Sequence, residues 1–179
     1  VGLDLTVEAN LTSAKSLVTV AYATFGSIID GGARTDLANR FNTASNIFST
    51  ASRIAKTVDV TADKSALTDS VIQGTNTDLS HITTALTNPL PASGSHGSSI
   101  TWRSSDTAVL SNDGQIINRP AFVNGDATII LTALISRELE CIQNIQIVGR
   151  GSGGACIPFI ATTKIFTLTV LRLPASTVA

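Results

Sequence analysis

Charged and aromatic residues are scarce in this sequence. Only 14% of the residues are charged and 4% are aromatic. Since about a quarter of an average globular protein is charged, much of this protein's surface has to be built from other polar groups. Threonine and serine take those positions, so we expect a neutral, hydroxyl-rich surface that repels neighbouring copies only weakly.

The balance of charge excludes two classes of partner. With 12 basic and 13 acidic residues, the net charge is −1. A chain without a basic excess has no electrostatic attraction for nucleic acid or for an acidic membrane surface. The apolar stretch over residues 17–29 is interrupted by threonine, glycine and serine, so it does not fit a membrane span. We therefore expect no nucleic-acid partner and no membrane insertion.

Histidine is rare as well, and His81 and His96 are the only two in the chain. Nucleophilic catalysis by a serine requires a base that a third group orients. The run Ser104-Ser105-Asp106 offers hydroxyl and carboxyl groups, but neither histidine lies in a sequence context typical of such a site. We interpret the run as turn chemistry and predict no catalytic residues.

Metal and phosphate sites also lack their usual patterns. The two cysteines and two histidines are too far apart in sequence for a zinc site. Four residues near turns could supply oxygen ligands for calcium: Asn112, Asp113, Asn124 and Asp126. A calcium loop needs several carboxylates at alternate positions, and here there are too few. The glycine-rich GRGSGG at 149–154 lacks the Lys-Ser/Thr ending of a phosphate-binding loop. We predict no metal and no cofactor.

The first third of the chain has the period of helices. Apolar residues recur at alternating spacings of four and three along residues 7–28 and again along 37–58, which gives one apolar stripe per helix. The glycine pair at 31–32 favours a helix end, and Thr35 is a suitable cap for the second helix. Because the connection is short, we predict an antiparallel α-helical hairpin over residues 1–58.

A short third helix is predicted over residues 62–72, capped by Thr61, with Leu67 and Val71 facing inward. Beyond it, strand-like segments alternate with turn residues such as Asn112-Asp113-Gly114. The expected strands are 79–86, 100–103, 109–110 paired with 116–117, 127–135, 142–148, 157–160 and 164–173. Short strands with this spacing indicate a β-sandwich or barrel.

Three ordered stretches then carry a family resemblance: PLPASGSHGSSITWRSSDTAVLSNDGQIINRP, GDATIILTALIS and TKIFTLTVL. Together they resemble the bacterial Ig-like domains, most closely the atrophied variety, over about residues 59–173. The resemblance implies a β-sandwich with Trp102 in its core and the Ser/Asp run in a turn. It also implies a spacer or binding module of secreted and cell-wall proteins, and no catalytic residues.

The sequence departs from the family pattern at about residues 137–162, where an insertion replaces a brief turn. Cys141 and Cys156 flank the glycine-rich segment of this insertion, with strand-like runs of similar length on both sides. We predict a protruding β-hairpin whose base is closed by a Cys141–Cys156 disulfide, which would contribute about 3 kcal/mol by chain entropy. Two separate buried thiols are the alternative. The predicted contact loop at the tip comprises Arg150, Gly151, Ser152 and Gly153.

The sequence therefore predicts an α+β protein with an α-helical hairpin at 1–58 and an Ig-like β-sandwich at 59–179 that carries the inserted hairpin. We expect a non-enzymatic structural protein of a bacterial surface layer, filament or envelope assembly. It would be extracellular or at the cell surface and act through protein contacts, by self-association or with other surface proteins. The alternative is an adhesin or accessory module that binds glycan or host protein through the tip or through residues 92–97. Exposed aromatic platforms for glycan are few, because the chain has one Trp, one Tyr and six Phe.

Overall fold

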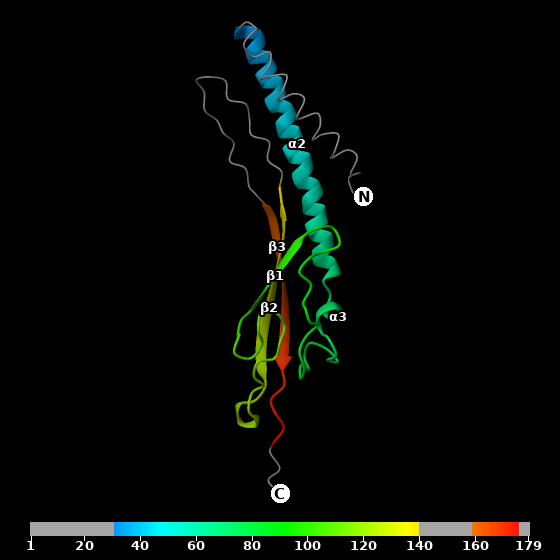
Figure 1. Cartoon of the computed structure of the whole chain (residues 1–179), viewed down its shortest axis with the longest axis vertical. Coiled ribbons are helices and arrows are strands. Elements are labelled where there is room, and N and C mark those ends of the chain that lie inside the picture. Colours follow the sequence, from blue (N-terminus) through cyan, green and yellow to red (C-terminus); the bar gives the residue numbers. More distant parts are fainter. Residues whose placement is uncertain (1–30, 140–158, 176–179) are drawn as a thin grey trace. The chain divides into compact units, whose positions relative to one another are not determined.

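A computed structural model describes residues 31–139 and 159–175. The chain divides into two compact units, residues 1–58 with 138–160 and residues 59–137 with 161–179. The described elements are α2 (Gly31–Ala66), α3 (Asp69–Ile72), β1 (Ser99–Ser104), the 3-10 helix η1 (Phe122–Asn124), β2 (Ala127–Glu138) and β3 (Phe159–Val170) (Figure 1). The fold is α+β, as expected. Whether the two units are independent domains stays a prediction.

One long helix replaces two of the predicted ones. α2 runs for 36 residues, so Thr35 and Thr61, both expected as caps, lie inside it. The prediction of a separate helix that begins at residue 62 is therefore wrong. Residues 62–66 belong to α2, and the separate helix, α3, comprises only Asp69–Ile72. The inward positions continue across the expected break, because Val60 and Asp63 are both 2% exposed. The helix predicted over residues 7–28 lies outside the described residues, and the helical hairpin stays a prediction.

In the first unit, α2 presents an apolar stripe to solvent. Ile47, Ile54 and Val58 are 66%, 61% and 52% exposed, although Val58 was expected to face inward. The hydroxyls of Thr43 and Thr57 donate to the carbonyl four residues earlier in the helix, at 2.9 and 2.7 Å. Their methyl groups therefore add to the apolar character of this face. No helix in the described ranges is long and apolar enough to cross a membrane.

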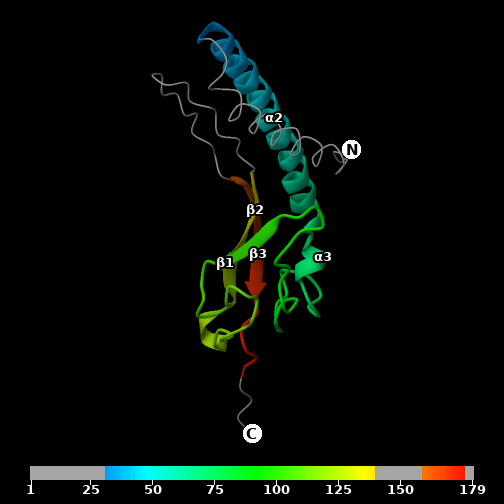
Figure 2. The same ribbon diagram turned by 45° about the horizontal axis from the view of Figure 1, so that its top comes forward.

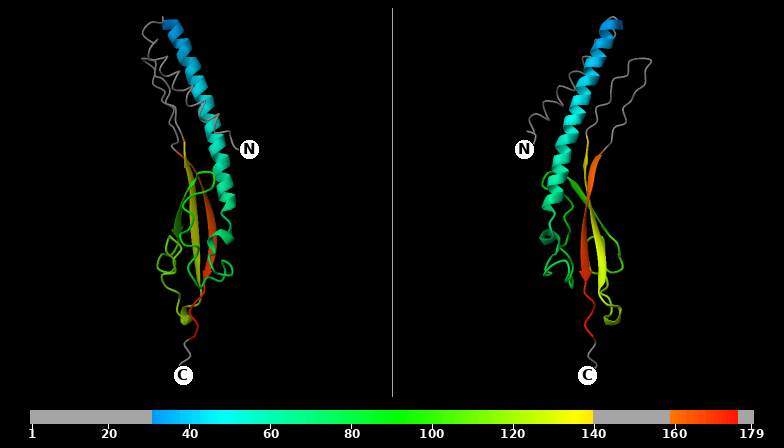
Figure 3. Two further views of the ribbon diagram at one scale, coloured as in Figure 1. Left: turned by 45° about the vertical axis from the view of Figure 1, so that its right-hand side comes forward. Right: turned by 180° about the vertical axis from the view of Figure 1, so that it is seen from behind.

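The second unit is built on a three-stranded sheet of order β1-β2-β3. β1 pairs antiparallel with β2 from Ser99 opposite Ser136 to Ser104 opposite Leu131, and β3 runs antiparallel along the other side of β2 (Figure 3). Alternate residues are buried, which defines the core face of the sheet. On β2 and β3 these are Ile129, Leu131, Ala133, Ile135, Phe166, Leu168 and Val170.

The layer against this core face is made of helix and loop. Within the second unit, α3 and the loop after it lie to one side of the sheet (Figure 2). Their buried residues, with those of the last turns of α2, are Val60, Leu67, Ile72, Leu79, Ile82, Leu86 and Leu90. Val71, expected to face inward, is 37% exposed. In residues 31–139 and 159–175 there is one sheet, so the described chain does not show the full two-sheet sandwich.

The strand predicted over residues 79–86 is wrong. Only a single parallel bridge, Ile82 with Val170, forms there. Buried Asn76 is the physical reason, because its Oδ1 accepts the backbone N–H groups of Thr83 and Thr84 at 2.9 and 3.1 Å. A side chain that binds local backbone groups competes with the strand ladder for them. The segment therefore folds as a loop that places its apolar residues in the core.

The other strand predictions have mixed outcomes. The strands at 100–103 and 127–135 are confirmed as β1 and β2, and the hairpin at 109–117 is confirmed as a single Leu110–Ile116 bridge. Its turn requires Gly114, whose φ is +88°. Residues 159–160 and 164–170 were assigned to two strands but belong to one, β3. The strand expected at 142–148 lies outside the described residues.

Truncation of a side chain should cost much more stability on the core face of the sheet than on its exposed face. Leu131→Ala should lower the free energy of unfolding by about 3 kcal/mol, because it leaves a cavity at a fully buried position. Ile165→Ala, at a residue 63% exposed, should change it by less than about 0.5 kcal/mol. Urea denaturation followed by circular dichroism measures both, and equal losses would contradict this assignment of the core face.

Candidate functional site

A single carboxylate is the most unusual feature of the described core. Asp63 is 2% exposed, and no other charged residue in the described ranges is buried to this degree. It lies on the inward stripe of α2, one turn after Val60 and one turn before buried Leu67, which follows the helix end. Burying an ionised carboxylate costs several kcal/mol unless hydrogen bonds replace its water, so the surroundings of Asp63 must supply donors.

A neighbouring loop supplies those donors. The backbone N–H of His96 donates to Asp63 Oδ1 at 2.9 Å, and the N–H of Ser98 donates to Oδ2 at 3.2 Å. The His96 ring adds a contact from Nδ1 to Oδ1 at 2.8 Å, and the Ser95 hydroxyl lies 3.5 Å from the same oxygen. We refer to Asp63 and residues 94–98 together as the Asp63 clasp.

The loop can reach the carboxylate only because position 94 is glycine. A Cβ at Gly94 would lie 2.1 Å from Asp63 Cγ, which is an impossible contact. The loop closes on itself through Gly94 N–H to Ser98 O at 2.9 Å and Gly97 N–H to Gly94 O at 3.1 Å. Gly97 has a φ of +85°, which favours glycine. The glycines of this segment therefore serve the clasp.

A second acidic residue, one helical turn earlier, strengthens the attachment. Arg137 at the end of β2 donates from Nη1 to the Asp59 carboxylate and to the carbonyl of His96. Both side chains of this ion pair are about a quarter exposed, at 26% and 25%. The end of α2, the 94–98 loop and the end of β2 are thus joined by one hydrogen-bonded network.

The network changes the acidity of Asp63. Burial raises the pKa of its carboxyl, but the donors of Ser98 and His96 outweigh burial and lower the pKa from 3.8 to about 2. The ionised form is thus the one that the folded protein stabilises. Asp63 is charged at any neutral or mildly acidic pH.

The geometry of the clasp differs from that of a serine–histidine–aspartate triad. In a triad the carboxylate binds one ring nitrogen and the serine the other. Here Asp63 and Ser95 both lie against the same nitrogen, Nδ1 of His96, at 2.8 and 3.2 Å. A base whose reactive nitrogen meets no nucleophile does not activate one, so the arrangement favours a structural role for His96.

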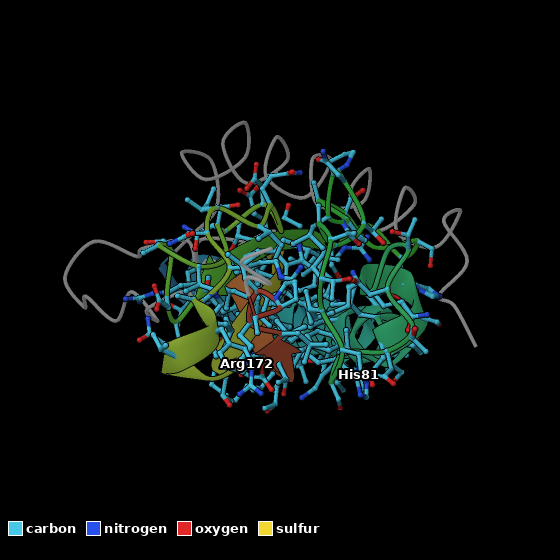
Figure 4. All side chains as sticks on the ribbon, turned by 90° about the horizontal axis from the view of Figure 1, so that it is seen from below. His81 and Arg172 are labelled. Atoms are coloured by element: carbon cyan, nitrogen blue, oxygen red, sulfur yellow. The ribbon has the colours of Figure 1, made fainter. Side chains whose placement is uncertain are left out.

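His81 is also engaged locally. Its Nδ1 lies 2.9 Å from Asp78 Oδ1, and this hydrogen bond lowers the pKa of the Asp78 carboxyl. The His81 side chain is 61% exposed. Figure 4 shows it at the surface, as it shows Arg172, which follows β3. The two histidines therefore belong to separate contacts.

The Ser/Asp run after Trp102 forms turn structure. The Asp106 carboxylate accepts the N–H of Ala108 at 2.9 Å, and the Ser104 hydroxyl donates to Asp106 O at 3.1 Å. Trp102 itself is half-buried; its Nε1–H donates to Pro91 O at 2.8 Å. Its ring lies 5.9 Å from that of Phe166, between centroids. The residue thus joins the margin of the core to the loop before β1.

Three of the four oxygen ligands considered for calcium, Asn112, Asp113 and Asp126, bond to protein groups through their side chains. Asn112 Oδ1 accepts the N–H of Ser104 at 2.8 Å, and Asp126 Oδ1 accepts that of Arg172 at 2.9 Å. Asp113 accepts a hydrogen bond from the Ser111 hydroxyl. Across the described ranges, no three His, Cys, Asp or Glu side chains come together as metal ligands.

Other predicted sites fall outside the described residues. These are Cys141 and Cys156, with their disulfide, and the contact loop Arg150, Gly151, Ser152 and Gly153; both remain predictions. Conversely, sequence reasoning did not single out Asp63. The signal that points to it is its spacing, because Asp63 lies at intervals of three and four from Val60 in α2 and from Leu67 just after the helix, and both of these are buried.

Comparison with known proteins identifies part of the chain. The family model of the atrophied bacterial Ig domain matches residues 60–144. The resemblance inferred from the sequence motifs is thereby confirmed over this range, which contains the whole Asp63 clasp and strands β1 and β2. No curated protein matches the chain.

The lowered pKa of Asp63 predicts how stability responds to acid. The folded pKa lies below the ordinary value, so the stabilisation is complete above about pH 4 and is lost as the pH falls towards 2. We expect the wild-type protein to lose about 2 kcal/mol through this residue. The Asp63→Asn variant should not show this loss of stability in acid. At neutral pH its free energy of unfolding should be about 2 kcal/mol lower than that of the wild type, because the NH2 group of the amide would face the N–H groups of the loop.

Urea denaturation at a series of pH values measures both effects. Asp69→Asn, at an exposed helical carboxylate, is the matched control and should follow the wild-type curve. Parallel pH dependences for the wild type and Asp63→Asn would contradict the assignment.

Proposed function

Because the family model of the atrophied bacterial Ig domain matches residues 60–144, we propose that the protein is a structural module of a bacterial surface assembly that acts through protein–protein contacts. Bacterial Ig-like domains are common on surface proteins and typically non-catalytic. The proposal goes further than the family, since it assigns a role in assembly, an extracellular location and no enzymatic activity. It rests on what the described surface offers to a partner.

The observation that carries the proposal is the exposed face of the sheet opposite the core. We call it the outer face; its residues are Thr101 and Arg103 on β1, Ile130, Thr132 and Leu134 on β2, and Thr163, Ile165 and Thr167 on β3. Ile130, Leu134 and Ile165 are 37%, 42% and 63% exposed. Apolar side chains gathered on one exposed face are typical of interaction surfaces.

The chemistry of the outer face fits a protein partner. Among the residues named, only Arg103 is charged, so two such surfaces meet without much repulsion or desolvation of charge. Threonine and isoleucine make a surface of hydroxyl and methyl groups on a rigid sheet. By contrast, the His, Asp and Ser groups that catalysis would use are engaged in the structural contacts described above.

A rigid loop favours a second candidate, ligand binding by an adhesin or accessory module. The Asp63 clasp fixes residues 94–98, while the His96 side chain stays 49% exposed. Binding loops gain affinity when they are held in one conformation before the ligand arrives. In this alternative, glycan or host protein would contact the loop around His96 or the tip at 149–154, and deletion of that tip would abolish adhesion.

Sedimentation of the whole chain tests the structural role. We expect the average mass to rise with protein concentration, and electron microscopy of the most concentrated samples to show ordered assemblies. A strict monomer at every concentration, together with binding in a glycan array, would favour the adhesin instead.

Thiol counting tests the extracellular location. If Cys141 and Cys156 pair in an oxidising compartment, the denatured, non-reduced protein should contain no reactive thiol, and reduction should release two. The disulfide should stabilise the fold by about 3 kcal/mol, so reduction should lower the urea midpoint. Two reactive thiols before reduction in protein from its native source would contradict both the pairing and the location.

A further inference from the structure

The two edges of the sheet differ in what covers them. On β1, Ile100 N–H donates to Ala92 O at 2.9 Å, and Ser104 N–H donates to the Asn112 side chain at 2.8 Å. The loop before β1 and the turn after it therefore occupy that edge. A covered edge is closed to a further strand.

Within residues 31–139 and 159–175, backbone groups bond to the outer edge of β3 only near its end. Thr169 N–H donates to Leu79 O at 2.8 Å, and Thr169 O accepts Ile82 N–H at 2.9 Å. Since backbone groups alternate in direction along a strand, the residues that point outward with Thr169 are Ala161, Thr163, Ile165 and Thr167. Within the described residues, no backbone group pairs with this stretch of the edge.

The open stretch also lacks the usual protection against pairing. It has no proline, its alternation of exposed and buried residues is regular, and its residues are mainly threonine and isoleucine. Its one charge, Lys164, turns towards the core side, where its ammonium donates to the carbonyl of Lys64 at 3.3 Å and lies 5.5 Å from the Phe166 ring centre. A neutral row of unpaired backbone groups accepts an extended strand.

We propose that the occupant is β3 of a second copy of this chain, paired antiparallel across the edge at residues 161–165. The proposal deepens the assembly role proposed above and rests on it, since it names the partner and the contact. An antiparallel pair of identical strands is related by a two-fold axis and is self-complementary.

The charge of Lys164 and the backbone bonds that Thr169 already makes together select the register of the pair. A two-fold axis at Lys164 would place two ammonium groups directly opposite each other, which is unfavourable. An axis at Ile165 would bring Ala161 opposite Thr169, whose backbone is already bonded to the 79–82 loop. An axis at Thr163 avoids both problems.

The Thr163 register also satisfies the side chains. It places Ile165 opposite Ala161 of the second copy on the outer face, and Lys164 opposite Thr162 on the core side. Thr163, whose N–H and C=O both point outward, would exchange two hydrogen bonds with its counterpart. The register places no two Lys164 side chains opposite each other and uses the open part of the edge. The Thr162 hydroxyl that faces Lys164 accepts from Lys64 Nζ of its own chain at 3.4 Å.

Substitutions at Thr163 test the register. Thr163→Pro removes the outward N–H without touching the ladder to β2, a change that edge strands tolerate. We expect the dissociation constant of the dimer to rise at least about tenfold, because the hydrogen bonds at the axis are lost in both copies. Thr163→Val keeps the N–H and the shape and should leave the constant unchanged.

A charge exchange gives the sharper result. Thr163→Glu and Thr163→Lys each place like charges together at the axis and should weaken association, whereas an equimolar mixture should re-form the dimer as a mixed pair. Thr107→Glu, at an exposed residue of the turn after β1 and off the outer face, is the matched control for added charge and should have no effect. Sedimentation measures association of the full chain, and circular dichroism with urea melts verifies that every variant is folded.

The outcomes separate the two proposals. Association that all three disrupting variants leave unchanged would overturn pairing through β3 and assign the contact to another surface, while the assembly role stands. A wild-type chain that stays monomeric at every concentration would overturn both. Weakened single variants with recovery in the mixture would establish the axis at Thr163.

Discussion

The buried charge of Asp63 is the constraint on which the second unit depends. A carboxylate inside a core is tolerated only when hydrogen bonds replace its water. Here the 94–98 loop provides them, through two backbone N–H groups and the side chains of Ser95 and His96. The loop must therefore follow one path, close enough that only glycine fits at position 94. Asp59 and Arg137 extend the same network to the end of β2. The residues that fasten the helix end are thus also those that shape the loop.

The same constraint sets the asymmetry of the sheet. Because the clasp holds the 94–98 loop, the preceding residues lie along β1, where Ala92 accepts the Ile100 N–H and Ser93 bridges to Ser99. That edge is closed as a consequence of the loop's path. Among the described residues, the backbone edge of β3 is bonded by the 79–82 loop alone, and Asn76 fixes the position of that loop through local hydrogen bonds. Two buried polar side chains therefore determine which edge of the sheet is open.

Those polar side chains also explain where sequence reasoning succeeds and fails. Strict alternation of apolar residues located β1, β2 and the end of β3, because burial on one face dictates a period of two. The strand expected at 79–86 fails because Asn76 takes the N–H groups that a ladder needs. Thr61 was read as a cap from its residue type, yet the inward stripe runs past it. The Asp63 clasp joins residues more than thirty positions apart, and such a long-range partnership leaves only a spacing signal in the sequence.

A single open edge limits what strand pairing can build. Two copies that pair through β3 use the open edge of both, so the contact closes at a dimer. A surface layer or filament therefore needs a further contact of different geometry. The outer face, with Ile130 and Leu134 on β2, and the exposed stripe of α2, with Ile47 and Ile54, both carry apolar groups that strand pairing leaves free. Assembly beyond the dimer thus requires one of these surfaces, whereas a module that only spaces or presents other parts of a surface protein requires neither.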